Sequence, residues 1–224
     1  MSFISLDPAD LKSDPLYVKV YALLKGWIIE GRIAPGERIK ETALAAELRV
    51  SRTPVRDALR RLEQDRLIVA APGSVYEVCS PTVQDLDELY MVRALLEGGA
   101  ARMAAQRSPA EAISQMGAIV AQMADAYGRS PAALIRELDA QFHEALIAAS
   151  GNAVLVELAD HLSIRLRHTR TLAGDVSVRQ QLVLEHHSAI VDALGKGDPD
   201  LAEAVARTHV LSIHRAIRES FPRR

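Results

Sequence analysis

The stretch PGERIKETALAAELRVSRTPVRDALRRLEQDRLI, residues 35–68, decides the fold of the front of the chain. A short helix is expected over about 41–48, and the tight turn Arg49-Val50-Ser51 leads from it into a longer helix. Pro54 is compatible with the longer helix because a helix needs no backbone donor in its first turn. The stretch therefore predicts two helices joined by a tight turn.

The flanking segments complete a small domain. Apolar residues recur at helical spacing before the stretch and predict a helix over about 15–30, which stops at Gly31. LIVAAPGSVYEV, residues 67–78, predicts two short strands around a Pro-Gly turn. Three helices and a hairpin are typical of a winged helix-turn-helix. We place it at residues 15–79, behind an N-terminal arm at 1–14.

One face of the longer helix carries a row of arginines. Arg52, Arg56 and Arg60 recur every four residues, so they share one side of the helix. Residues 15–70 carry eleven Lys/Arg against seven Asp/Glu, whereas residues 79–224 carry fifteen against eighteen. A cationic face on the second helix of a helix-turn-helix suits the major groove of double-stranded DNA, where arginine pairs with guanine edges or holds phosphates. The alternative is a solvated charged face.

Beyond Ser80-Pro81 the chain is expected to be helical throughout. Six helices are predicted, over about 82–106, 109–127, 131–149, 152–172, 177–195 and 199–220. The predicted fold class is therefore mainly α. It combines an N-terminal winged helix-turn-helix with a C-terminal all-α six-helix bundle over residues 80–224.

The composition restricts where the protein works. The 224-residue chain has no run of about 18 apolar residues, so no membrane segment is expected. Its N-terminus lacks the apolar core of a signal peptide. The single cysteine, Cys79, cannot form an internal disulfide, which fits a reducing compartment. We therefore expect a cytoplasmic protein.

Arg93 lies inside the apolar stripe of the helix predicted over 82–106. A buried arginine needs a partner. Glu97, one turn further on, could supply it as an internal ion pair. Alternatively, Arg93 could point into a cavity and bind the carboxylate of a ligand. The sequence leaves both interpretations open.

The back half also carries a candidate set of metal ligands. Asp139 and His143 lie four residues apart on one helix, and His187 and His209 occupy apolar positions of two later helices. Three imidazoles and one carboxylate suit one divalent ion per subunit, such as zinc, nickel or manganese. The remaining charge of +1 and the free coordination positions favour a carboxylate ligand. Each buried histidine could instead be a core residue bonded to the backbone. The remaining histidines are interpreted as structural, namely His161, His168, His186 and His214.

The opening stretch resembles the N-terminal domain of GntR-family regulators, whose motif runs P-G-x-x-L, then L-A, then V-S-R-T-P-V-R-x-A-L-x-x-L. The resemblance implies that Arg52, Thr53, Pro54 and Arg56 lie at the DNA. Arg66 stands where the family usually has glycine. The wing reads PGSVYE, without the usual basic residue, which puts wing contacts to DNA in doubt.

Four later segments resemble the FCD effector domain of the FadR subfamily. They are LYMVRALLEGGAARMAA, LDAQFHEALIAASGN, HHSAIVDALGKGD and ARTHV. The metal pattern of that domain is an Asp-x3-His pair followed by two later histidines. The resemblance therefore implies that Asp139, His143, His187 and His209 hold the metal. It also implies a homodimer whose DNA binding a ligand relieves.

Together these features predict a ligand-responsive, DNA-binding transcriptional regulator. We expect a repressor that a small carboxylate metabolite releases from its operator, and no enzymatic activity. One alternative is a metal-dependent hydrolase fused to a DNA-binding module, because such a site could activate water. Glu137 and Glu144, which flank the ligands, point to other faces and offer no general base. A second alternative is a DNA-binding protein whose back half only dimerises.

Overall fold

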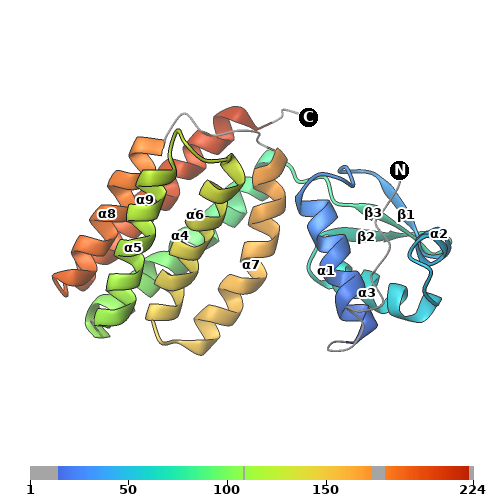
Figure 1. Ribbon diagram of the computed structural model, residues 1–224, viewed down its shortest axis with the longest axis horizontal. Coiled ribbons are helices and arrows are strands. Elements are labelled where there is room, and N and C mark those ends of the chain that lie inside the picture. The colour runs from blue at the N-terminus through green and yellow to red at the C-terminus, as the bar shows by residue number, and fades with distance from the viewer. Residues whose placement is uncertain (1–14, 108, 173–179, 222–224) are drawn as a thin grey trace. The chain divides into compact units, whose positions relative to one another are not determined.

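The computed structural model describes residues 15–107, 109–172 and 180–221 (Figure 1). The predicted arm at 1–14 and the predicted helix start at 177 lie outside these residues. The described chain forms two compact units. The first extends to Thr82 and the second begins at Val83, while Arg167–Leu172 group with the first.

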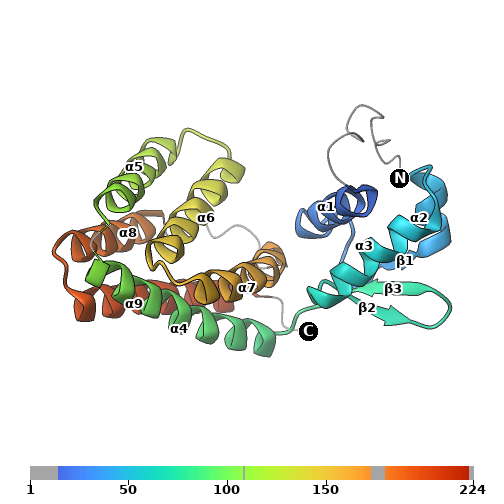
Figure 2. The same ribbon diagram turned by 90° about the horizontal axis from the view of Figure 1, so that it is seen from below.

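The first unit is a winged helix-turn-helix. Its elements are, in chain order, α1 (Leu16–Ile29), β1 (Arg38–Lys40), α2 (Glu41–Glu47), α3 (Arg52–Gln64), β2 (Ile68–Ala71) and β3 (Val75–Val78). The strands form an antiparallel sheet in the order β1-β3-β2. Figure 2 shows β2 and β3 as the hairpin of the wing. The predicted helices and hairpin are confirmed.

The sequence pattern does not predict β1, so the sheet has one more strand than expected. β1 contains three residues, of which only Ile39 faces the interior. Such a short segment shows no alternation long enough to be recognised. β1 instead owes its existence to pairing with β3, where Ile39 lies opposite Tyr76.

Helices α1 and α3 pack against each other through one face each. The buried residues are those that the helical spacing predicts: Val20, Leu24, Trp27 and Ile28 on α1, and Val55, Ala58, Leu59 and Leu62 on α3. The Tyr21 hydroxyl donates a hydrogen bond to Oδ2 of Asp65, just after α3, at 2.5 Å. This packing leaves Arg52 and Arg60 on the exposed face of α3.

Two turns of this unit place arginines in the left-handed region of backbone space. Arg49, in the turn between α2 and α3, has φ 55°, and Arg66, after α3, has φ 58°. A side chain with a Cβ is strained there, whereas glycine is not. The φ of Arg66 therefore gives the physical reason why glycine is usual at this position of the GntR motif.

The second unit is built from helices, of which the described residues contain six. They are α4 (Val83–Arg107), α5 (Ala110–Ala126), α6 (Ala132–Ala149), α7 (Ala153–Leu172), α8 (Gln180–Gly195) and α9 (Pro199–Ser220). The predicted six-helix architecture is confirmed. No helix in the described part of the chain is long and apolar enough to cross a membrane.

Helices α4 and α9 run side by side (Figure 2). Their close approach depends on small side chains, because a Cβ added at Gly98 would lie 2.6 Å from Cγ of Arg207. The main core lies between α4, α5, α6, α8 and α9, and includes Phe142, Leu146, Ile190, Leu194 and Ala206. This core positions the inward-facing residues of α6, α8 and α9.

The helix starts follow local capping rules, with one correction. The Asp198 side chain accepts a hydrogen bond from the Leu201 backbone N–H at 3.0 Å, so Asp198 caps α9 and Pro199 begins it, as predicted. The helix predicted over about 131–149 begins one residue later, at Ala132, with Pro131 in the cap position. The N–H of Ser130 bonds to the Ala126 carbonyl and closes the turn after α5.

The strain at Arg66 gives a first prediction. Replacing Arg66 with glycine should raise the free energy of unfolding of the first unit by roughly 0.5–1 kcal/mol, because glycine tolerates the positive φ. Urea unfolding followed by the fluorescence of Trp27, the single tryptophan of the chain, reports on this unit alone. Arg66→Ala keeps a Cβ and is the matched control, for which no gain is expected. A glycine variant no more stable than the alanine variant would refute the strain argument.

Candidate metal centre and DNA-binding face

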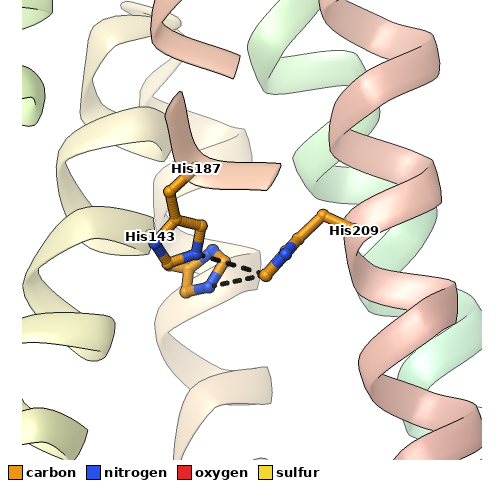
Figure 3. Close-up of side chains that lie close together, drawn as sticks. All are labelled: His143, His187 and His209. Atoms are coloured by element: carbon orange, nitrogen blue, oxygen red, sulfur yellow. Dashed lines mark hydrogen bonds between the residues drawn. The ribbon is translucent and has the colours of Figure 1, made fainter. Parts of the chain in front are cut away.

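Three histidines from three helices converge inside the second unit (Figure 3). His143 lies on α6, His187 on α8 and His209 on α9, and none of them is more than 8% exposed. Nε2 of His209 lies 3.3 Å from Nε2 of His187 and 3.3 Å from Nε2 of His143. The structure therefore brings together all three histidines that were predicted as metal ligands.

Hydrogen bonding satisfies this arrangement only through sharing. A neutral imidazole nitrogen carries either one hydrogen or one lone pair. The two contacts of His209 Nε2, each 3.3 Å long, must therefore share one hydrogen or one lone pair. Each of them is then weaker than a full hydrogen bond. A central cation removes the need to share because all three nitrogens can present lone pairs to it.

The geometry and the charges fit a divalent metal ion. Two nitrogens bound to zinc at about 2.0–2.1 Å and at tetrahedral angles lie about 3.3–3.4 Å apart, close to the observed spacing. Oδ1 of Asp139 lies 3.7 Å from Nε2 of His143 and 3.8 Å from Nε2 of His187. Asp139 therefore stands beside the cluster as a fourth donor that a small shift would bring to the ion.

The pKa values of the three rings differ because their surroundings differ. Burial, reinforced by His143, lowers the pKa of His187 to about 3. Burial and then His187 lower the pKa of His209 well below its usual value. Burial acts on His143 as well, but the carboxylates of Glu97 and Asp139 together outweigh it and raise the pKa of His143. A metal binds the neutral imidazole, so metal affinity is expected to fall as the pH falls.

Arg93 and Glu97 lie next to this cluster and form the internal ion pair that the sequence allowed. Nε of Arg93 donates to Oε1 of Glu97 at 2.5 Å, and both side chains are buried. Burial alone would raise the pKa of Glu97, but the charges of Arg93 and His143 hold it at about 2. The geometry therefore gives Arg93 a protein partner, and its role toward an effector stays a prediction.

The other histidines have separate surroundings. Nε2 of His214 lies 2.7 Å from Oδ1 of Asp87, and its ring stacks on Tyr90 at 5.3 Å between centroids, which links α9 to α4. The His186 ring meets the His209 ring edge-on at 5.6 Å. His161 and His168 lie on α7. None of the four belongs to the group of converging nitrogens in the described residues.

The predicted DNA-binding residues lie together on α3, and the structure adds a residue that holds two of them. Glu41, the first residue of α2, is 3% exposed. Nε of Arg52 donates to Oε1 of Glu41 at 2.9 Å, and Nε of Arg56 donates to Oε2 at 3.3 Å. The two arginine side chains remain 53% and 43% exposed, so their guanidinium groups are held at the surface.

This arrangement also affects the charge of the glutamate. Hydrogen bonds from Arg56 and then Arg52 lower the pKa of Glu41 despite its burial, so it is ionised at neutral pH. Thr53 and Arg60 are exposed on the same helix, and Pro54 is half-buried in its first turn. Sequence reasoning missed Glu41 because no local pattern connects it to arginines eleven and fifteen residues away.

Comparisons with known proteins agree with both units. Residues 16–78 match the family described as "Bacterial regulatory proteins, gntR family", and residues 88–212 match the FCD domain. The chain is 32% identical over 203 residues to the HTH-type transcriptional regulator YdhC of Bacillus subtilis, with 90% of this chain and 88% of that protein covered. It is 25% identical over 207 residues to the HTH-type transcriptional repressor RspR of Escherichia coli K12, with 92% and 91% covered.

The fold is shared with a solved structure of a GntR transcriptional regulator from Rhodococcus sp. RHA1. The TM-score is 0.73 at 25% identity, over 92% of this chain and 99% of that one. These relatives are named as regulators and not as enzymes, so the hydrolase alternative has no support. The chain therefore belongs to the GntR family of bacterial transcriptional regulators, with an N-terminal DNA-binding domain and a C-terminal FCD domain.

Proposed function

We propose that this regulator is a metal-containing homodimer whose binding to operator DNA is controlled by a small carboxylate. The observation that carries the proposal is the convergence of three buried imidazole nitrogens, all within 4.8 Å of one another. His143, His187, His209 and Asp139 would hold one divalent ion, with zinc, nickel or manganese as the candidates. When bound, the ion supplies a Lewis-acidic position for an anionic ligand.

The effector class follows from the charges at the site. Arg93 and Glu97 cancel each other, so a divalent ion beside the Asp139 carboxylate leaves a local charge of about +1. The four protein donors leave coordination positions open for an octahedral ion such as nickel or manganese, or for zinc that expands its shell. We expect a carboxylate ligand to bind at such an open coordination position.

The DNA-binding role of individual residues is supported by the exposed face of α3. Arg52, Thr53, Pro54 and Arg56 lie in its first two turns, and Arg60 follows one turn later. Glu41 fixes Arg52 and Arg56 before DNA arrives, which reduces the entropy that these long side chains lose on binding. We infer that these arginines read base edges or phosphates in the major groove.

Homodimer formation is supported by exposed apolar pairs on two helices of the FCD domain. Met91 and Leu95 on α4, and Val154 and Leu158 on α7, are between 53% and 65% exposed. Each pair is four residues apart and therefore lies on one side of its helix. A second copy of the chain would cover them. It would also provide the second half-site contact that operators of this kind require.

Repression is the proposed mode of action. The relative RspR is named as a transcriptional repressor. Effector binding at the metal would weaken operator binding, and linkage requires the coupling to be reciprocal.

The arginine face gives a prediction for DNA recognition. Arg52→Ala should weaken operator binding by about 1–3 kcal/mol and relax the base preference at one position of each half-site. Arg61→Ala is the matched control, because Arg61 lies on the same helix but over the Tyr21 ring of α1. Fluorescence anisotropy on operator and on random DNA makes the comparison. An equal loss on both DNAs would assign Arg52 to the phosphates instead.

The histidine cluster gives a prediction for metal content. Protein purified without a His-tag should contain close to one divalent ion per chain. His187→Ala or His209→Ala should lower the metal content and the thermal stability together, because bound metal stabilises the folded state. His161→Ala, exposed on α7, is the control and should keep its metal. Wild-type protein that contains no metal and takes up neither zinc nor nickel rules out the centre.

The effector hypothesis is tested through its reciprocity. Small mono-, di- and tricarboxylates are titrated into metal-loaded protein on operator DNA, with the corresponding amides as uncharged controls. At least one carboxylate should release the DNA, and operator DNA should weaken its binding by the same factor. The metal-free His209→Ala variant should not respond. If no carboxylate changes the operator affinity, the assigned effector class is wrong.

A further inference from the structure

Glu97 connects two buried groups through its two carboxylate oxygens. Oε1 accepts the hydrogen bond from Nε of Arg93, and Oε2 lies 2.9 Å from Nδ1 of His143. All three residues are at most 8% exposed, so water does not compete freely for these contacts. The contact with His143 links α4 to α6, across 46 residues of sequence.

We propose that Glu97 is a positioning residue for the metal centre. Oε2 of Glu97 and Nδ1 of His143 are 2.9 Å apart, and a small rotation of either side chain turns this contact into a hydrogen bond from Nδ1–H. That bond fixes the His143 ring in the tautomer whose Nε2 carries the lone pair. Arg93 in turn holds the Glu97 carboxylate. The inference rests on the proposed function in one respect, namely that the histidine cluster binds a metal.

The positions of the two ring nitrogens support this role. Nε2 of His143 faces the cluster, 3.3 Å from Nε2 of His209 and 3.7 Å from Oδ1 of Asp139. Nδ1 lies on the other side of the ring and faces Glu97. An ionised carboxylate can only accept hydrogen bonds, so it requires the hydrogen on Nδ1. In metal sites, the ring nitrogen of a histidine that does not bind the metal usually donates a hydrogen bond, often to a carboxylate.

His143 differs in this respect from the other two histidines. None of the three Nδ1 atoms makes a hydrogen bond of good geometry among the described residues, and neither does Oε2 of Glu97. Nδ1 of His143, however, has this carboxylate oxygen beside it at 2.9 Å. The ring of His187 is instead held by stacking on Phe142, at 3.9 Å between centroids. His143 is therefore the histidine of the cluster whose tautomer a carboxylate sets before a metal arrives.

Arg93 makes it possible for Glu97 to be both buried and ionised beside His143. A buried carboxylate without a cation is strongly unfavourable, and Arg93 supplies the charge from the same helix, one turn away. Its guanidinium group also lies over the Tyr90 ring, 5.7 Å from the centroid. The contacts thus assign Arg93 to the support of the metal centre, in preference to direct binding of the effector.

Two variants separate positioning from simple stabilisation. Glu97→Gln keeps the side-chain volume but leaves the charge of Arg93 unpaired, so it is expected to lower stability as well. The double variant Arg93→Met/Glu97→Met removes both charges and the acceptor of the His143 hydrogen, and should recover the stability of the metal-free protein. Glu203→Gln is the matched control, because Glu203 also pairs with an arginine four residues away, Arg207 at 3.8 Å, on the surface of α9.

The readouts are the zinc dissociation constant, from competition with a chelator, and the ring ¹⁵N shifts of His143, which report its tautomer. Both Glu97 variants should bind zinc about 10–100-fold more weakly than wild type. The double variant should also lose the Nδ1–H tautomer of His143 in the metal-free protein, because methionine offers no carboxylate or amide oxygen to accept that hydrogen. Glu203→Gln should change neither quantity.

The two proposals fail in distinguishable ways. If wild-type protein does not bind zinc, the metal centre is wrong, but the tautomer measurement still tests Glu97 in the metal-free protein. If the folded double variant binds zinc as tightly as wild type, or keeps the Nδ1–H tautomer, Glu97 is only a structural partner of Arg93 and the inference is overturned.

Discussion

The FCD domain depends on one constraint: three imidazole nitrogens meet in its interior and must share the hydrogens between them. The rings come from α6, α8 and α9, so a cation bound by all three nitrogens would also tie these helices together. The surrounding core of Phe142 and its neighbours holds the rings in place, and Oδ1 of Asp139 lies 3.7 Å from Nε2 of His143 and 3.8 Å from Nε2 of His187. Metal binding and folding of this domain are therefore expected to be coupled.

In both domains a buried glutamate lies against side chains that are assigned to binding. In the DNA-binding domain, buried Glu41 holds Arg52 and Arg56 at the surface of α3. In the FCD domain, buried Glu97 lies between Arg93 and His143. In each case a carboxylate that water cannot reach freely fixes the side chains assigned to binding. The binding groups are thus held in place by the protein before the partner arrives, which lowers the entropic cost of binding.

Much of this architecture could be predicted from the sequence, because it follows from local periodicity. The helices of both domains and the buried face of α3 follow from apolar spacing on single helices. The three converging histidines were predicted from two apolar positions, from the four-residue spacing of Asp139 and His143, and from the resemblance to the FCD domain. What could not be predicted depends on contacts between distant segments. β1 exists through pairing with β3, Glu41 faces arginines from another helix, and Glu97 reaches His143 across 46 residues. The sequence allowed two partners for Arg93, and packing shows the contact with Glu97, while the contact with an effector stays a prediction.

The most direct test of the metal centre is X-ray absorption at the zinc edge, on protein loaded with one equivalent of zinc. The account predicts three imidazole nitrogens at about 2.0–2.1 Å, with their multiple-scattering signature, and additional oxygen ligands in the first shell. A first shell that consists only of oxygen atoms, or one that contains a single imidazole, would contradict the assignment of His143, His187 and His209 to one ion.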